Sequence, residues 1–324
     1  MYPKPYLAYP DQLAKMVSRG LAVRDEDRVL ALLQAAGYYH LSGYLYAFRK
    51  RDETGTVVVP ERYEDNLTSD YLESLWRVDS RVRSVWLEGL LMVEMGLRAH
   101  LAYRLGALGA FAHLDRSMLD GRECSKVPRR EAQTGGNRDR FTLWSERYES
   151  LQRQASGEAY VKHVLAEYGP PLPIWIGVEF LDFGAATTLL ELSRYADRQV
   201  IASQLGFRVE AEFRSSMRQL NYFRNVCGHN SRLWNRVAVV RAQTPDPRYV
   251  PKDLRHLLGA RTDKVYFPMA VTAYAIGKLH PGSDWPARMA AVLSSFPVIN
   301  DHSVEADMGF TPKWDLETVW REAL

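Results

Sequence analysis

Apolar residues recur at three- and four-residue steps along an extended stretch of the chain, from Thr68 to Leu105. This spacing places the apolar side chains on one side of a helix, so the stretch predicts one or two long helices. Shorter stretches with the same period predict helices at Asp11–Ser18, Asp25–Ala36, Glu158–Glu167, Val178–Tyr195 and Val209–Asn225. A chain dominated by this period is expected to fold as a mainly α protein whose apolar stripes pack together.

Strand signals are few. The clearest is the β-branched run Gly55–Val59, which is followed by Pro60 and predicts a small β-hairpin arm. A weaker candidate strand lies at Val237–Val240.

Three segments are expected along the chain. Residues 1–66 form an N-terminal helical region, residues 67–243 a helical core, and residues 244–324 a C-terminal segment that packs on this core. The core contains an inserted loop at residues 116–140, where seven basic and four acidic residues and several glycines predict an exposed, mobile loop. Three prolines within residues 244–251 separate the last segment from the core.

The composition excludes several classes of protein. Of the 324 residues, 46% are hydrophobic and 25% are charged, which is too apolar for a disordered chain. Two cysteines exclude a disulfide-stapled scaffold and a cysteine-rich zinc module. No signal peptide and no uncharged run of about 18 residues is present, so we expect a soluble cytoplasmic protein without a membrane span. No spacing typical of metal ligands occurs, and we expect no metal and no cofactor.

The most informative polar residue is Arg224. It continues the apolar stripe formed by Phe213, Met217 and Leu220, and a guanidinium on a core-facing stripe is costly unless it is paired. Two interpretations remain open: an ion pair with a buried acid, or an arginine directed into a cleft to hold a phosphate.

His229 lies five residues after Arg224, which is about 140° around a regular helix. The two side chains would converge only if the helix distorts near Gly228 or if a second copy of the segment faces the first. Together with Asn225 they suit RNA cleavage, because RNA carries its own nucleophile, the 2′-hydroxyl. A histidine can move that proton, an arginine can neutralise the developing charge, and an asparagine can orient the phosphate or the histidine.

The charge distribution also favours a nucleic-acid partner. Residues 213–261 contain ten basic and two acidic residues, although the whole chain has a net charge of only +3. This segment predicts attraction to the RNA backbone through Arg218, Arg232 and Arg236, with tyrosines and a tryptophan available for stacking. The alternative is a solvated helix face followed by a basic loop.

Arg224-Asn-x-x-x-His229 resembles the Arg-x(4–6)-His motif of HEPN ribonucleases. The chain also resembles the Abi-like (AbiD/AbiF) family of bacterial abortive-infection proteins over residues 4–320. The matching stretches are Gly37-Tyr-Tyr-His-Leu-Ser-Gly-Tyr44, Trp76-Arg-Val-Asp79, Val93-Glu94-Met-Gly-Leu-Arg98, Pro173-Ile-Trp175 with Glu179 and Phe183-Gly184, and Met308-Gly-Phe310 through Trp320.

The resemblance implies a HEPN-type helical bundle and an endoribonuclease in phage defence that leaves a 2′,3′-cyclic phosphate and a 5′-hydroxyl. Arg224, Asn225 and His229 would be catalytic, with Asn230 in support, and Glu94 and Arg98 would form a second cluster near the site. Since the chain has one such motif and HEPN enzymes combine two, it implies a homodimer with a composite active site.

The expected partner is RNA, such as a small noncoding RNA or a tRNA. The alternative is a catalytically silent protein that binds a small noncoding RNA without cutting it. A DNA-binding regulator is the least favoured interpretation, because no recognition-helix motif is present.

Overall fold

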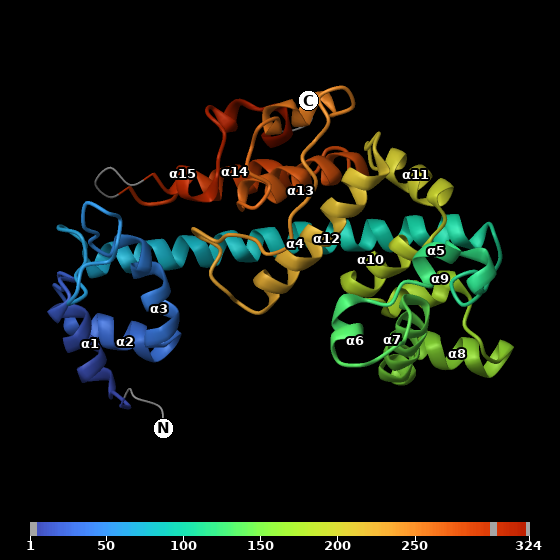
Figure 1. Cartoon of the computed structure of the whole chain (residues 1–324), viewed down its shortest axis with the longest axis horizontal. Coiled ribbons are helices and arrows are strands. Elements are labelled where there is room, and N and C mark those ends of the chain that lie inside the picture. The colour runs from blue at the N-terminus through green and yellow to red at the C-terminus, as the bar shows by residue number, and fades with distance from the viewer. Residues whose placement is uncertain (1–4, 299–302, 322–324) are drawn as a thin grey trace.

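The computed structural model describes residues 5–298 and 303–321, and in these residues the chain is mainly helical, which confirms the predicted class (Figure 1). Residues 1–4 of the expected segment 1–66, and residues 299–302 and 322–324 of the expected segment 244–324, lie outside the described residues. The helices are α1 (Tyr9–Ser18), α2 (Glu26–Ala36), α3 (Tyr38–Leu45), α4 (Ser69–Gly106), α5 (Gly121–Cys124), α6 (Arg129–Gln133), α7 (Arg140–Gln154), α8 (Ala159–Tyr168), α9 (Ile174–Gly177), α10 (Phe183–Leu192), α11 (Tyr195–Gln204), α12 (Glu210–Gly228), α13 (Tyr266–Leu279), α14 (Trp285–Leu293) and α15 (Val304–Met308).

Helix α4 is the axis of the fold. Its 38 residues form one continuous helix, which at 1.5 Å per residue is about 57 Å long. The Thr68 hydroxyl accepts a hydrogen bond from the Tyr71 amide at 3.1 Å and caps the first turn. The apolar stripe from Leu72 to Leu105 is buried and packs against α10, α12, α13 and α14. The predicted long helix is therefore confirmed.

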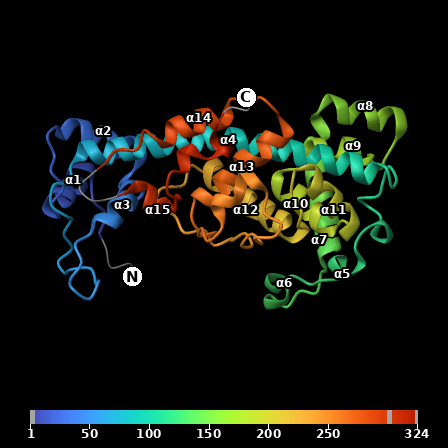
Figure 2. The ribbon, with the colours of Figure 1, turned by 90° about the horizontal axis from the view of Figure 1, so that it is seen from above.

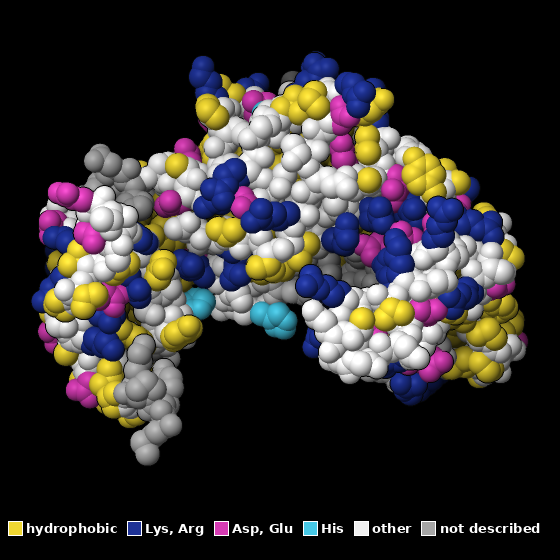
Figure 3. All heavy atoms as spheres, in the orientation of Figure 1, with side chains coloured by type: hydrophobic (Ala, Val, Ile, Leu, Met, Phe, Trp, Pro, Cys, Tyr) yellow, Lys and Arg dark blue, Asp and Glu magenta, His cyan; other side chains and the backbone are white. Residues whose placement is uncertain are grey.

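The two ends of α4 carry separate groups of helices (Figures 1 and 2). Helices α1–α3 lie at its N-terminal end and α5–α9 at its C-terminal end, while α12 packs across its middle. Viewed as in Figure 1, the lower edge of the molecule is concave between these two ends (Figure 3). Helix α12, which carries the predicted motif, ends on this side of the molecule (Figure 1).

Helices α13 and α14 approach α4 closely at two glycines. A Cβ atom at Gly89 would lie 2.4 Å from Cε2 of Trp285, and one at Gly96 would lie 2.5 Å from Cδ1 of Leu279. The indole of Trp285 also donates a hydrogen bond to the Val85 carbonyl at 2.7 Å. The C-terminal helices can therefore seat on α4 only because these two positions have no side chain.

The predicted β-hairpin arm is not formed as a pair of strands. Two isolated antiparallel bridges, Arg51 with Val57 and Arg49 with Tyr63, hold the arm together, and the part of the chain that the structure describes contains no regular strand. Pro60 lies between the two bridges on one side of the arm, and it has no N–H to continue the pairing.

The segment 116–140 differs from the mobile loop expected there. It folds into short helices because the Asp120 side chain accepts hydrogen bonds from the amides of the next turn, and the Asp120 amide donates to the Leu192 carbonyl at 2.8 Å. Leu119 and Cys124 are buried and fix the segment to the rest of the protein. Two apolar residues, Leu119 and Cys124, were too weak a signal to reveal this in the sequence.

Two further predictions were wrong in detail. The helix expected at Val178–Tyr195 begins later, at α10, because the Asp182 side chain accepts a hydrogen bond from the Ala185 amide at 2.7 Å and starts a new helix. The Val237–Val240 segment contains no strand. No helix of the described residues is long and apolar enough to cross a membrane.

Candidate functional site at helix α12

Helix α12 directs Arg224 toward α4. Phe213, Met217 and Leu220 are fully buried along one side of α12, and Arg224 follows on the same side. Its Nε lies 3.4 Å from the Glu94 carboxylate of α4. The structure therefore contains the ion pair with a buried acid that one interpretation of the sequence expected, and it also places Arg224 on the wall of a pocket.

Glu94 and Arg98 lie one turn apart on α4 and both approach this region. Glu94 is 5% exposed. Burial raises the pKa of its carboxyl above the ordinary value, and the charges of Arg224 and Arg98 oppose the rise. Arg98 donates to the carbonyls of Leu181 at 3.0 Å and Glu179 at 3.2 Å. Glu94 thus contacts the motif directly, whereas Arg98 fixes the backbone that leads into α10.

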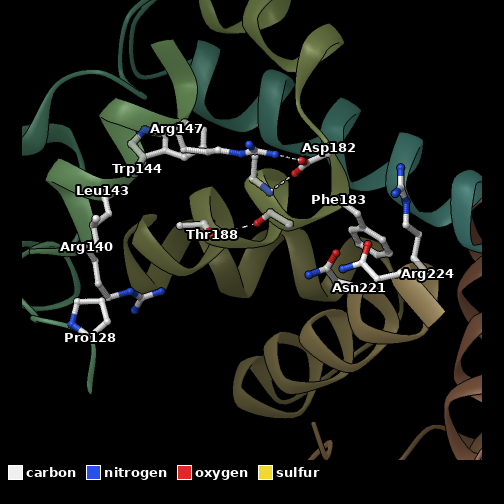
Figure 4. A pocket seen from close by; sticks show the side chains of 13 residues that line it. Pro128, Arg140, Leu143, Trp144, Arg147, Asp182, Phe183, Thr188, Asn221 and Arg224 are labelled. Carbon is white, nitrogen blue, oxygen red and sulfur yellow. Dashed lines mark hydrogen bonds and ion pairs between the residues drawn. The ribbon is translucent and has the colours of Figure 1, made fainter. Parts of the chain in front are cut away.

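A pocket of about 480 Å³ lies between α7, α10 and α12. Arg224, Asn225 and Asn221 line it from α12, and Arg140 and Arg147 line it from α7 (Figure 4). Sequence reasoning missed Asn221, Arg140 and Arg147. Asn221 is one turn before Asn225, and this spacing was the available signal for its place beside the motif.

The arginines of the pocket differ in how firmly they are held. Arg140 pairs with both Glu123 and Glu191, and its side chain is largely buried. Arg147 pairs with Asp182 at the rim, where both side chains are substantially exposed. Lys and Arg side chains gather with Asp and Glu over the region of α10 and α12 (Figure 3), so the surface there is mixed in charge.

His229 lies at the opposite edge of the motif. Helix α12 ends at Gly228, and His229 is the capping residue, exposed to solvent, whose amide donates to the Asn225 carbonyl at 2.9 Å. It does not line the pocket that Arg224 lines. The helix stays regular up to Gly228, so within one chain the structure does not bring Arg224 and His229 together.

A buried polar network holds the loop that follows His229. Arg83 of α4 donates from Nε to the side-chain amide oxygen Oδ1 of Asn230 at 2.9 Å, and it pairs with Asp79 one turn away. Asp79 also accepts hydrogen bonds from the amide of Trp234 at 2.7 Å and the hydroxyl of Tyr44 at 2.5 Å. The loop is thus fastened to α4 and to α3 at once.

This network was not predicted, although the sequence contained a signal for it. Asp79 and Arg83 are one turn apart on the apolar stripe of the long helix, and both are almost fully buried. Two charged residues on a core-facing stripe indicate an internal ion pair, because neither is stable there alone. Asn230 takes a positive φ of 53°, and its side-chain amide oxygen accepts the hydrogen bond from Arg83.

The three arginines predicted to bind RNA all have partners within the chain. Arg218 lies 3.1 Å from the Glu191 carboxylate and is half exposed. Arg232 donates to the Gly43 carbonyl of α3, and burial lowers its pKa. Arg236 donates to the Arg232 carbonyl at 2.6 Å and to the Tyr222 hydroxyl at 3.1 Å. Arg232 and Arg236 therefore help to shape the loop after the motif.

Cys227 is buried inside the motif, and burial raises the pKa of its thiol, which disfavours the nucleophilic thiolate. Within residues 5–298 and 303–321, no group of three or more His, Cys, Asp or Glu side chains is arranged to hold a metal ion.

A family model described as Abi-like protein matches residues 31–235, which is more than half of the 324-residue chain. The match includes the whole motif and the helices that surround it, whereas the wider resemblance over residues 4–320 is not matched outside this range. No curated protein and no solved structure matches the chain.

Proposed function

Because the chain belongs to the Abi-like protein family, we propose that it is a metal-independent endoribonuclease of the HEPN type that acts in bacterial abortive infection. The observation that carries the proposal is the arrangement of helix α12. Arg224 and Asn225 line a pocket, and the solvent-exposed His229 caps the same helix before a loop fixed by buried hydrogen bonds.

In this mechanism the RNA 2′-hydroxyl attacks the adjacent phosphorus. The imidazole of His229 moves a proton to or from the reacting oxygens, since histidine exchanges protons near neutral pH. The guanidinium of Arg224 neutralises the charge that develops on the phosphate, and Asn225 orients the phosphate. The products are a 2′,3′-cyclic phosphate and a 5′-hydroxyl.

The same geometry supports a composite site in a homodimer. Arg224 and His229 leave one regular helix about 140° apart, so a phosphate held by Arg224 of one chain would meet His229 of a second chain. This proposal makes RNA and a second copy of the chain the partners of the site.

The test is RNA cleavage in EDTA by the wild type, Arg224→Ala and His229→Ala. His163→Ala is the matched control, since His163 is an exposed histidine on α8. We expect cleavage by the wild type and the control, products with 5′-hydroxyl ends, and no cleavage by the other two. Activity that requires a divalent metal, or that persists in His229→Ala, would refute the mechanism.

Mixing the two inactive variants tests the composite site. A heterodimer of Arg224→Ala and His229→Ala retains one intact arginine and one intact histidine on different chains. Restored cleavage after co-refolding supports a shared site, whereas an inactive mixture argues for a site within one chain.

One observation favours a second function, namely RNA binding without cleavage. Within one chain Arg224 and Asn225 line the pocket and His229 does not, so the pocket holds groups that bind a phosphate without a histidine beside them. In that case RNA that co-purifies with the protein would be intact and stoichiometric, and its ends would be the same for wild type and His229→Ala.

A further inference from the structure

Two asparagines on one wall of the pocket between α7, α10 and α12 have side-chain amides that are available for hydrogen bonds to a ligand. Asn221 and Asn225 are one turn apart on α12, and both line the pocket. Neither side-chain amide has a hydrogen-bond partner among the described residues, although most polar side chains around them do. Each amide presents a donor beside an acceptor, which is the pattern that reads the edge of a nucleobase.

The arginines at the same pocket suit a phosphate. The printed contact of Arg224 with Glu94 runs from Nε at 3.4 Å and leaves the guanidinium one-third exposed at the pocket wall. The ion pair of Arg147 with Asp182 is open to solvent on both sides, and such exposed pairs contribute little and are readily exchanged. The guanidiniums of Arg147 and Arg224 can therefore bind an anion at the rim of the pocket, while Arg140 remains held by its two glutamates.

The size and walls of the pocket suit one nucleotide. Its volume of about 480 Å³ lies within the usual range of small-ligand sites, about 300–1,000 Å³. Leu143 and Pro128 supply apolar surface opposite the asparagines, and Gly184 leaves the space in front of Asn221 open. Figure 4 shows Asn221 and Arg224 on one side of the pocket and Arg140 and Leu143 on the other.

We propose that this pocket binds a single nucleotide of RNA, with the base edge against Asn221 and the phosphate against Asn225, Arg147 and Arg224. This inference rests on the proposed function. If the protein cleaves RNA, the nucleotide in the pocket is the one next to the scissile phosphate, and the pocket selects it. We therefore expect cleavage to favour one base at that position.

The direct test is calorimetric binding of the four nucleoside 3′-monophosphates to the full-length wild-type protein, with inorganic phosphate as the comparison. We expect one nucleotide to bind at least tenfold more tightly than inorganic phosphate. Asn221→Ala should weaken that nucleotide about tenfold, as expected for the loss of one bidentate base contact, and should leave phosphate unchanged. Asn137→Ala is the control, because Asn137 is exposed and lies outside the pocket.

A second variant narrows the pocket without removing a polar group. In Gly184→Ala the new Cβ would lie 3.5 Å from the Asn221 amide nitrogen and 3.4 Å from the Asp182 carboxylate, which are ordinary contacts. The protein should therefore fold normally and bind the preferred nucleotide more weakly. An unchanged melting temperature with reduced nucleotide affinity supports the site independently of Asn221→Ala.

The outcomes separate this inference from the proposed function. Equal binding of all four nucleotides, or binding unaffected by both pocket variants, refutes the nucleotide site even if the protein cleaves RNA. Selective nucleotide binding by a wild type that cleaves no RNA in EDTA would instead support the site and refute the catalytic proposal.

Discussion

Removing the charge of Asp79 should loosen the loop that carries the predicted catalytic histidine. Asp79 is fully buried, and its carboxylate accepts hydrogen bonds from Tyr44, from Arg83 and from the amides of Leu233 and Trp234. In Asp79→Asn the side chain keeps its shape but loses its charge, and its amide nitrogen must face one of these donors.

The size of the expected loss of stability follows from the charge of Arg83, which remains buried in the variant. Arg83 is 2% exposed, and without Asp79 its charge has no opposite charge beside it. Removing one partner of a buried ion pair costs about 3–5 kcal/mol, because the other charge stays buried without compensation. We therefore expect Asp79→Asn to lower the free energy of unfolding by about 3–5 kcal/mol. The double variant Asp79→Asn/Arg83→Met should lose less than the sum of the two single variants, because it buries no unpaired charge.

Urea unfolding followed by circular dichroism measures these free energies. An unchanged slope of the unfolding free energy against urea concentration would show that the folded state stays equally compact. Hydrogen exchange of the amides of residues 229–236 reports the loop itself and should become faster in Asp79→Asn. Arg81→Met is the control, because Arg81 is exposed on the same helix and its loss should change stability by about 0.5 kcal/mol or less.

Two results would refute the reasoning. If Asp79→Asn unfolds at the wild-type urea concentration, the network does not stabilise the fold. If the two single variants are destabilised and their losses simply add in the double variant, Asp79 and Arg83 are not energetically coupled. Their close contact would then contribute no interaction energy to the fold.

Three further predictions concern packing and pH. Gly89→Ala should destabilise the protein by about 1–3 kcal/mol, because its Cβ would overlap Trp285, whereas Gly277→Ala in α13 meets nothing within 4 Å and should be neutral or stabilise by up to about 1 kcal/mol in urea unfolding. Burial lowers the pKa of His113 to about 4, so the folded state binds this proton less tightly than the unfolded chain. Stability should fall by about 3 kcal/mol between pH 6.5 and 4, and His113→Leu should flatten that slope in melting curves. Burial raises the pKa of Glu94, so stability should fall as pH rises from about 4.3 through the folded pKa. Glu94→Gln should therefore gain stability relative to the wild type over that window, and an unchanged difference between the two would contradict the assignment.

The helices that depend on their own sequence could be predicted without a structure. The period of α4 and the Thr68 cap are local properties, and so is the apolar stripe of α12 that ends in Arg224. The Arg224–His229 motif and the membership of the family rest on the order of residues alone. The same local geometry predicted that these two side chains diverge.

Other elements depend on contacts between distant parts of the chain. The segment 116–140 becomes helical through caps and through the contact of Asp120 with Leu192, and the arm at residues 49–63 forms bridges without strands. In the first case one tertiary hydrogen bond adds to the local caps. In the arm Pro60 interrupts the pairing, and the Tyr63 amide donates instead to the Arg19 carbonyl at 2.7 Å. Propensity reflects neither effect, so it gave the wrong result.

The candidate site also depends partly on the local sequence and partly on tertiary contacts. The sequence by itself determined the types of the predicted catalytic groups and their angle around one helix, because the geometry of a helix is fixed by its backbone. Only the tertiary structure decided which acid meets Arg224, that Asn221 joins Asn225 at a pocket, and that Asp79 and Arg83 fasten the loop after His229. These contacts depend on helices that are far apart in the chain, with α4 packed on α12 and with α7 and α10 around the two asparagines. Whether a charge is buried beside its partner or exposed to water depends on how the helices pack.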